Sequence, residues 1–352
     1  MMNIIIWNCR RALKPSFQSS VRDLVSIHDP AILIIMETRL GKNKAKEVTD
    51  RLPFQGAIQA NTLGFAGGLW FLWDPNRVDI TNLTSTKQEI QVLVKVRSSS
   101  LNWILTAVYA SPRHRERCML WNNLSPVAST HNLPWIIAGD FNELLSSEDK
   151  LGGRPISLYR ANIFKECLDA CNMADLGFQG PRYTWTKNHD LCSLIQERLD
   201  RFFANPDWCV LYLEAQVTHL ARSSSDHCPV LVELEPQTNI RLNRPFQFHN
   251  FWLSDNSFPK IVQNAWSTKP GLYSSIKKFK RDASEWNRVH FGNIFAKKKR
   301  ILARLGGIQR SMAERPSSFL INLEKQLQAE LLYVMNQEEE LWSLKSRVNW
   351  TV

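Results

Sequence analysis

The sequence predicts a layered α/β domain over its first 235 residues and a separate helical region after it. Up to residue 235, short apolar runs alternate with amphipathic or turn-rich connections, as strands and helices do in α/β domains. Towards the C-terminus, apolar residues instead recur at helical spacing. The 352 residues are 44% apolar, so the chain can bury at least one sizeable core, and its length favours two domains.

Eight apolar runs bounded by polar or turn-forming residues are predicted strands: Asn3–Trp7, Ile32–Met36, Gly68–Trp73, Ile90–Val96, Trp103–Val108, Trp135–Ala138, Gln216–Leu220 and Pro229–Glu233. Four amphipathic segments are predicted helices: Ser16–His28, Lys42–Leu52, Arg115–Ser125 and Leu158–Met173. Strands and helices therefore occur in turn along the whole first part of the chain.

The polar, strand-poor segment that follows Glu235 favours a linker over residues 236–275 and a basic helical region over residues 276–352. That region holds two apolar stripes at helical spacing, one over residues 301–312 and one over residues 320–334, with a proline between them. This arrangement favours an antiparallel helical hairpin. A coiled-coil partner chain is a second interpretation of the same stripes.

The positive charge of the chain is concentrated in its C-terminal third. Residues 1–240 hold 25 Lys and Arg against 24 Asp and Glu, whereas residues 241–352 hold 19 against 9. The total of +11 therefore comes almost entirely from the C-terminal part. A surface of this sign suits a polyanionic partner such as nucleic acid.

The cysteines and the first residues bear on the compartment. Seven cysteines, an odd number without a Cys-x-x-Cys pair, favour a reducing compartment, which is the nucleus or the cytoplasm. The apolar run at the start precedes its arginines, which is the reverse of a secretory signal, so secretion is not expected. No stretch of 18 apolar residues occurs, and no membrane partner is expected.

Polar side chains follow four of the predicted strands at the point where each strand ends. These residues are Asn8, Glu37, Tyr109, and Asp140 with Asn142. If the strands run parallel, their carboxyl ends would present these side chains on one edge of the sheets, where ligand sites of α/β folds collect. Each residue alone has an ordinary interpretation as a turn, a cap or a half-buried aromatic.

Two later segments extend this set: Glu197–Arg201, which contains Asp200, and Ser224–Pro229, which contains Asp226 and His227. Together with the strand-end residues they make six motifs in the order of the endonuclease/exonuclease/phosphatase superfamily, which the chain resembles over about residues 2–235. The resemblance implies a four-layer α/β sandwich, in which two packed mixed β-sheets are flanked by helices. The C-terminal helical region would be an extension of that fold.

Further segments narrow the resemblance to the endonuclease of plant LINE-type (non-LTR) retrotransposons: Trp7–Arg10, Met36–Thr38, Val108–Pro112 and Gly180–Trp185. Two C-terminal segments resemble the linker just upstream of the polymerase of those elements: Trp286–Asn293 and Lys345–Trp350. Because the sequence ends at Val352 without a reverse transcriptase, we interpret it as a truncated element or as a gene model cut from one.

The resemblance implies hydrolysis of a phosphodiester with Mg²⁺, for which Mn²⁺ could substitute. Glu37 and Asn8 would hold the ion and Asp226 would add a ligand, since Mg²⁺ prefers carboxylate and amide oxygens. Charge neutralisation by the metal would stabilise the phosphate and the leaving oxygen during in-line attack.

The resemblance also implies the roles of the remaining side chains. Asp140 would be the general base or would orient the attacking water, and Asn142 would bind the phosphate. His227, held by Asp200, would be cationic near neutral pH and would donate to a non-bridging oxygen, because a neighbouring carboxylate raises the pKa of histidine. Tyr109 would supply one more donor. Thr184 would lie near the phosphate.

One position departs from the pattern of the family, in which glycine usually follows Trp-Asn-Cys-Arg, whereas this chain has Arg11. Glycine in such a loop indicates a positive φ or a close approach of another backbone. We therefore expect Arg11 either to strain the loop that carries Asn8 or to contact a DNA phosphate through its guanidinium.

The leading hypothesis is a Mg²⁺-dependent, DNA-nicking endonuclease with element RNA as a further partner, and the oligomeric state stays open. Abasic-site endonucleases, inositol polyphosphate phosphatases and sphingomyelinases use the same constellation, so the fold does not settle the substrate. The second hypothesis is an inactive relic that binds nucleic acid through its basic C-terminal region. There, Lys277–Arg281 and Lys297–Arg300 would contact phosphates or act as a nuclear localisation signal.

Overall fold

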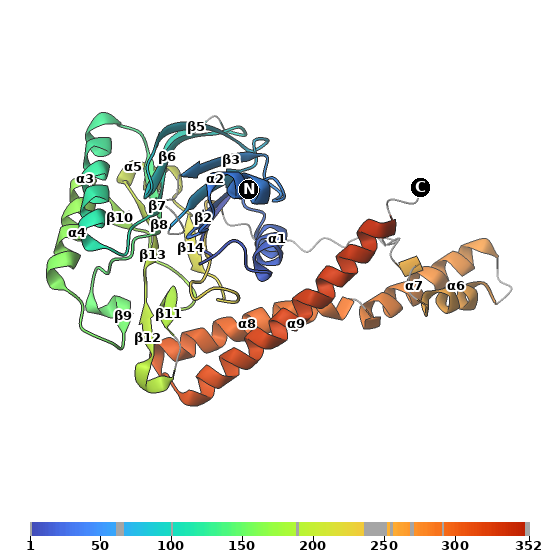
Figure 1. Cartoon of the computed structure of the whole chain (residues 1–352). Helices are drawn as coiled ribbons and strands as arrows, with labels where there is room; N and C mark the ends of the chain where they lie inside the picture. Colours follow the sequence, from blue (N-terminus) through green and yellow to red (C-terminus); the bar gives the residue numbers. More distant parts are fainter. Residues whose placement is uncertain are drawn as a thin grey trace. The chain divides into compact units, whose positions relative to one another are not determined.

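The protein is described by a computed structural model (Figure 1), which covers residues 2–60, 67–99, 101–187, 190–235, 252–253, 256–267, 271–290 and 292–348. The chain divides into two compact units, the first made of residues 1–237 with Leu305–Lys325 and the second of residues 238–304 with 326–352. None of the described helices combines the length and the apolar character that crossing a lipid bilayer requires.

The first sheet of the first unit has six strands in the order β14-β15-β1-β2-β4-β3. Their bounds are β1 Asn3–Asn8, β2 Ile32–Met36, β3 Gly56–Ala60, β4 Leu69–Trp73, β14 Gln216–His219 and β15 Val230–Glu233. Strands β1 and β2 are parallel, and every other pair in this sheet is antiparallel. The sheet is therefore mixed, as predicted.

The second sheet also has six strands, in the order β10-β13-β8-β7-β6-β5. Their bounds are β5 Val78–Ser85, β6 Glu89–Val96, β7 Asn102–Tyr109, β8 Trp135–Asp140, β10 Ala174–Asp175 and β13 Asp200–Ala204. Here β7 and β8 form the parallel pair. A small third sheet joins β11 (Trp185–Lys187), β12 (Ile195–Glu197) and β9 (Lys150–Leu151).

The side chains of β1 explain the layering. Ile4 and Ile6 lie in the core between the two large sheets, while Ile5 and Trp7 point to the opposite face and pack with Phe17. Both faces of the strand are covered, which is why it is an unbroken apolar run rather than an alternating one.

Helices cover the outer face of each large sheet (Figure 1). Helices α1 (Ser16–His28) and α2 (Lys42–Thr49) pack on the first sheet, and α3 (His114–Thr130) and α4 (Leu158–Ala170) pack on the second. The order helix, sheet, sheet, helix is the predicted four-layer α/β sandwich, which is thereby confirmed. Shorter helices are α5 (Pro206–Leu211) and the 3₁₀ turns η1 (Ser147–Asp149) and η2 (Leu191–Ser193).

All eight predicted strands and all four predicted helices of the first 235 residues are present, with shifts of a few residues at their ends. Three longer strands were missed: β3, β5 and β13. Strands β3 and β5 are sheet edges, and five of the eight residues of β5 are exposed, so their apolar pattern is weak. Helix α3 continues through Pro126, where the prediction ended it, because the ring removes only one backbone donor.

The second unit contains helices α6 (Phe258–Trp266) and α7 (Leu272–His290), which pack around Trp252, Phe258 and Trp286. Helix α6 lies within the predicted linker 236–275, of which residues 236–251 lie outside the described residues. The limits of the linker stay a prediction.

Helices α8 (Gly292–Glu314) and α9 (Ser318–Val348) form the predicted antiparallel hairpin. Lys298 near the start of α8 pairs with Glu338 far along α9, with 2.6 Å between Nζ and Oε2. Near the turn, Gln309 and Glu324 are joined by a hydrogen bond of 2.9 Å. The hairpin was therefore predicted correctly.

The tip of this hairpin belongs to the first unit, where a buried polar cluster joins it to the loop before β15. The Arg222 guanidinium donates to Glu324 Oε1 at 2.6 Å, and both side chains are at most 3% exposed. Gln309 accepts from the Arg222 backbone N–H and donates to the Arg222 carbonyl, each at 3.0 Å. The predicted domain end near residue 235 did not include this second contribution to the unit.

We expect Arg222→Met to lower the free energy of unfolding by about 3–5 kcal/mol, because it leaves the Glu324 carboxylate buried without a counter-ion. Denaturant unfolding followed by tryptophan fluorescence measures this. The exposed i,i+4 pair of Arg51 and Glu47 offers the matched control, and Arg51→Met should cost less than about 1 kcal/mol. Equal losses in both variants would contradict the role given to Arg222.

Candidate active site

The topology brings four side chains to one edge of the sheets. Asp140 ends β8, and Tyr109 stands beside it at the end of the parallel strand β7. Strand β13 runs antiparallel to β8, so its first residue, Asp200, pairs with Asp140. Asn8 ends β1 of the facing sheet and donates its amide to Asp140 Oδ2 at 2.9 Å. The predicted convergence of strand ends is therefore present.

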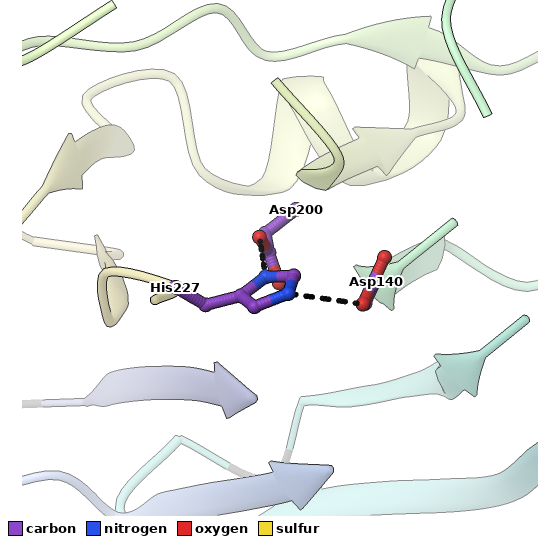
Figure 2. Close-up of side chains that lie close together, drawn as sticks. All are labelled: Asp140, Asp200 and His227. Carbon is purple, nitrogen blue, oxygen red and sulfur yellow. Dashed lines mark hydrogen bonds and ion pairs between the residues drawn. The ribbon is translucent and has the colours of Figure 1, made fainter. Parts of the chain in front are cut away.

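His227 completes a chain of contacts with two of these acids (Figure 2). Its Nδ1 lies 2.8 Å from Asp200 Oδ2, and its Nε2 lies 3.9 Å from Asp140 Oδ2. All three side chains are at most 4% exposed. A buried carboxylate at hydrogen-bond distance from Nδ1 leaves Nε2 as the atom that faces Asp140.

The burial and the charges of this cluster shift its proton equilibria. Burial, followed by the charge of Asp200, raises the pKa of Asp140 to about 7, against the opposing effects of His227 and Asn8. Burial alone would lower the pKa of His227, but Asp200 and then Asp140 outweigh it and raise that pKa to about 9. Near neutral pH the site therefore combines a carboxylate of unusual basicity with an imidazolium.

The local sequence Gly139-Asp140-Phe141-Asn142 fixes the Asp140 carboxylate. A Cβ added at Gly139 would lie 1.8 Å from the Val108 carbonyl oxygen, so only glycine fits directly before Asp140. Phe141 is fully buried in the core under α3 and α4. Asn142 has a φ of 45°; its backbone N–H donates to Asp140 Oδ1 at 2.9 Å and its amide to the Ala110 carbonyl at 2.8 Å.

Tyr109 and Thr184 line the same edge. Burial, followed by the charges of Glu37 and Asp140, raises the pKa of Tyr109, which therefore keeps its phenolic proton. Thr184 is fully buried, and its Oγ1 accepts the backbone N–H groups of Leu199 and Asp200 at 2.9 and 3.0 Å. It holds the start of β13 in place, while its predicted contact with the phosphate stays a prediction.

The predicted metal ligands Glu37 and Asp226 share one guanidinium, that of Arg10. Its Nε lies 2.8 and 2.9 Å from the two Asp226 oxygens, and its Nη1 lies 3.5 Å from Glu37 Oε1. Arg39 makes a further short ion pair with Glu37. Trp185 Nε1 donates to Asp226 Oδ2 at 3.0 Å. The two acids thus form a second cluster beside the His227 cluster.

The backbone strain expected at Arg11 lies one residue earlier. Among the described residues with positive φ are Arg10 at 63°, Glu37 at 54° and Arg39 at 57°, whereas Arg11 is not one of them. The expectation that Arg11 strains the loop is therefore wrong, because the left-handed turn is formed by Arg10. Arg11 is exposed, and its predicted contact with DNA stays a prediction.

Two groups of oxygen and nitrogen donors are candidates for a divalent metal. Ligand atoms of Asp140, Asp200 and His227 lie within 4.8 Å of one another and could hold an ion. A protonated His227 already bridges those acids, however, and an imidazolium is no metal ligand. The acids of the second group, Glu37 and Asp226, are held together by a cation already, and such hard oxygens fit Mg²⁺ or Mn²⁺.

This arrangement of two sheets with acids, amides and a histidine at one edge agrees with a sequence match. The profile of the Endonuclease/Exonuclease/phosphatase family matches residues 5–227, which includes all of the site residues named above. The chain belongs to this family. Its members hydrolyse phosphate esters, so family membership supports hydrolase activity. A comparison with curated protein sequences found no match.

Solved structures of family enzymes share the fold. The endonuclease domain of TRAS1, a telomere-specific non-LTR retrotransposon, aligns with a TM-score of 0.51 at 15% identity, covering 68% of this chain and 100% of that one. The AP endonuclease LMAP from Leishmania major gives 0.52 at 16% identity, with 66% and 86% covered. An AP endonuclease from Archaeoglobus fulgidus gives 0.50 at 14%, with 66% and 99% covered.

Three contributors to the site were missed from the sequence: Arg10, Arg39 and Trp185. Each lies inside or beside a segment that was singled out, but none was given a role. Basic and aromatic residues beside a motif are common, and only the fold shows that their side chains contact Glu37 and Asp226.

Proposed function

We propose that the chain is a divalent-metal-dependent phosphodiesterase that nicks DNA. The proposal is carried by the buried contacts from Asp200 through His227 to Asp140, which set a basic carboxylate beside a cation at one edge of the sheets. Hydrolysis of a phosphodiester requires both: an acceptor for the proton of water and positive charge for the phosphate.

Asp140 takes the proton from the attacking water. A carboxylate with a pKa of about 7 is ionised in a large fraction of molecules at neutral pH and is more basic than an ordinary aspartate. Its two oxygens are fixed by donors from Asn8 and from the backbone of Asn142, so the carboxylate plane is set before substrate arrives. Asn142 and Tyr109 supply further hydrogen bonds to the phosphate.

His227 stabilises the charge that develops on a non-bridging oxygen. The 3.9 Å gap between its Nε2 and Asp140 Oδ2 is too long for a hydrogen bond, which leaves the Nε2 proton for the substrate. Asp200 orients the ring through Nδ1 and keeps it cationic. Asp200 and Thr184 are thus positioning residues for His227.

Glu37, Asn8 and Asp226 would hold the metal, for which Mg²⁺ is the first candidate and Mn²⁺ the second. When bound, such an ion supplies positive charge to the phosphate and to the leaving oxygen. The donor set supports this assignment, since carboxylate and amide oxygens are hard ligands and two acids already share one cation there.

Further observations support the proposed substrate, origin and location. A likeness of fold to the TRAS1 endonuclease domain and to AP endonucleases supports DNA as the substrate. The motifs that resemble plant LINE-type elements support an origin in a non-LTR retrotransposon, with element RNA as a further partner. The seven free cysteines and the basic C-terminal region fit the nucleus or another reducing compartment.

The second candidate is an inactive relic that binds nucleic acid, which the charge of the C-terminal part favours. Incubation of supercoiled plasmid with Mg²⁺ or with EDTA separates the two. We expect open circles in Mg²⁺ and none in EDTA. A parallel preparation of the Asp140→Asn variant should nick at least about 10²-fold more slowly, which excludes a contaminating nuclease. DNA binding without nicking in either Mg²⁺ or Mn²⁺ would support the inactive, nucleic-acid-binding relic instead.

We expect the basic face of α7 to contribute to non-specific DNA affinity. Lys277, Lys280 and Arg281 are exposed on that helix. Replacing all three by Gln should lower the slope of log K against log salt by about 2 to 3, since each neutralised phosphate contributes roughly 0.9. Fluorescence anisotropy of a labelled duplex across a salt series measures the slope.

The control changes the same number of charges on exposed residues of the first unit: Arg51, Lys95 and Arg97, each replaced by Gln. The slope should stay within about 1 of the wild-type value in this variant. Equal reductions in the two triple variants would mean that net charge, and not the α7 face, sets the affinity.

A further inference from the structure

Arg10 lies at the centre of the acids that are proposed to hold the metal. Its guanidinium contacts both Asp226 oxygens through Nε and Nη2 and reaches Glu37 through Nη1. Its backbone N–H donates to Asn8 Oδ1 at 3.0 Å. One residue therefore occupies an oxygen of each of the three proposed ligands.

This occupation has an electrostatic consequence. Without a metal, two carboxylates at close range repel each other, and the shared guanidinium compensates that repulsion. A divalent ion between the same oxygens would bring two positive charges next to the guanidinium. The ion and the Arg10 side chain would also compete for the same lone pairs of Asp226.

Arg39 does not fill the same role. Of the acids in the described part of the chain, its side chain pairs with Glu37, and its backbone N–H is held by the Gly67 carbonyl at 2.9 Å. Asp226 keeps a second partner in Trp185, so its carboxylate stays anchored if the guanidinium leaves. The Arg10 side chain is 39% exposed and has solvent on one side to move into.

We propose that Arg10 is an internal counter-ion that competes with the divalent metal for Glu37 and Asp226. In the metal-free protein it holds the two acids together, and metal binding requires it to release them. The inference rests on the proposed function and deepens it, because it makes occupation of the metal site depend on displacing a residue of the chain itself.

Calorimetric titration of the full chain with Mn²⁺, in the absence of DNA, tests the competition. Arg10→Gln should lower the dissociation constant for Mn²⁺ at least about tenfold, because a cation beside the ligands is removed. In EDTA the same variant should have a lower melting temperature than the wild type, since its acids lose their counter-ion. Saturating Mn²⁺ should raise the melting temperature of the variant more than that of the wild type.

Arg11→Gln is the matched control, as it makes the same charge change on the neighbouring exposed residue. Its dissociation constant for Mn²⁺ should stay within about twofold of the wild-type value. Arg10→Lys keeps the test usable if Arg10→Gln misfolds. Lysine keeps the positive charge but cannot contact both acids through separate nitrogens, so this variant should bind Mn²⁺ with intermediate affinity.

The outcomes distinguish this inference from the proposed function. If the wild type binds Mn²⁺ and nicks plasmid while Arg10→Gln binds it equally or more weakly, the competition is overturned and the proposed function stands. If only Arg10→Gln binds Mn²⁺, Arg10 blocks the site in this chain: the competition holds and the proposed activity fails. If neither binds, both are overturned.

Discussion

Asp140→Asn is expected to reduce metal-dependent nicking by about 10² to 10⁴-fold, the range typical of a lost general base. Asparagine is almost isosteric and can keep the hydrogen bond with the backbone N–H of Asn142, but it cannot accept a proton from water. Initial rates of plasmid nicking under saturating Mg²⁺ measure the loss. Asp79, which is half-exposed and remote in sequence from the site, is replaced by Asn as the control and should nick at the wild-type rate.

The same substitution should change how the stability of the fold depends on pH. The pKa of Asp140 is raised to about 7, so the stabilising effect of its protonated form is complete below its ordinary value of 3.8 and is lost as pH rises through about 7. Asparagine imitates the neutral form and avoids this loss, but its amide nitrogen cannot accept the hydrogen bond that Asn8 donates to Asp140 Oδ2. We therefore expect a constant cost from that lost hydrogen bond, and a stability relative to the wild type that improves as pH rises through about 7. A marked fall in the melting temperature of Asp140→Asn would mean that its activity is lost through misfolding instead.

Asp200→Asn should produce the second large effect, through His227. Burial disfavours the imidazolium, and Asp200 is the strongest of the groups that outweigh burial and raise the pKa of His227 to about 9. Without that carboxylate the pKa of His227 should fall, and nicking at pH 7.5 should fall by about 10²-fold. Titration of the imidazole signals by NMR between pH 5 and 10 follows the shift directly.

A second buried histidine is the internal control for this titration. His219 lies 2.7 Å from the Pro181 carbonyl, and burial lowers its pKa to about 4. Its signal should change little in Asp200→Asn compared with that of His227. The free energy of unfolding should also depend on pH. The stabilising contribution of the His227 imidazolium is complete below about pH 6.5 and is lost as pH rises through about 9. The variant should therefore lose stability at neutral pH but not above pH 9.

The sequence by itself determined the class of fold and predicted the residues that gather at one edge of the sheets. Buried strands such as β1 and β2 are unbroken apolar runs because helices or a second sheet cover both faces, so they stand out without any structure. Asp140 and His227 were found because they sit in short motifs whose order along the chain is specific. Local signals of this kind depend only on neighbours in sequence.

Contacts between distant segments could not be obtained that way. Arg10 meets Asp226 across 216 positions, and Arg222 meets Gln309 and Glu324 across 87 and 102. The sequence around a loop arginine does not indicate which distant carboxylate the arginine will contact in the fold. The edge strand β5 was missed for a related reason, because its pairing is decided by β6 and not by its own pattern.

What the tertiary structure alone decided is therefore the electrostatics of the site. The residue types that bind a metal and a phosphate can be read from the chain, whereas burial and the distances between charges set the pKa values of Asp140 and His227. The same packing places the Arg10 guanidinium, and not Arg11, between Glu37 and Asp226. Burial and charge separation are properties of the whole fold, and no local segment of the sequence contains them.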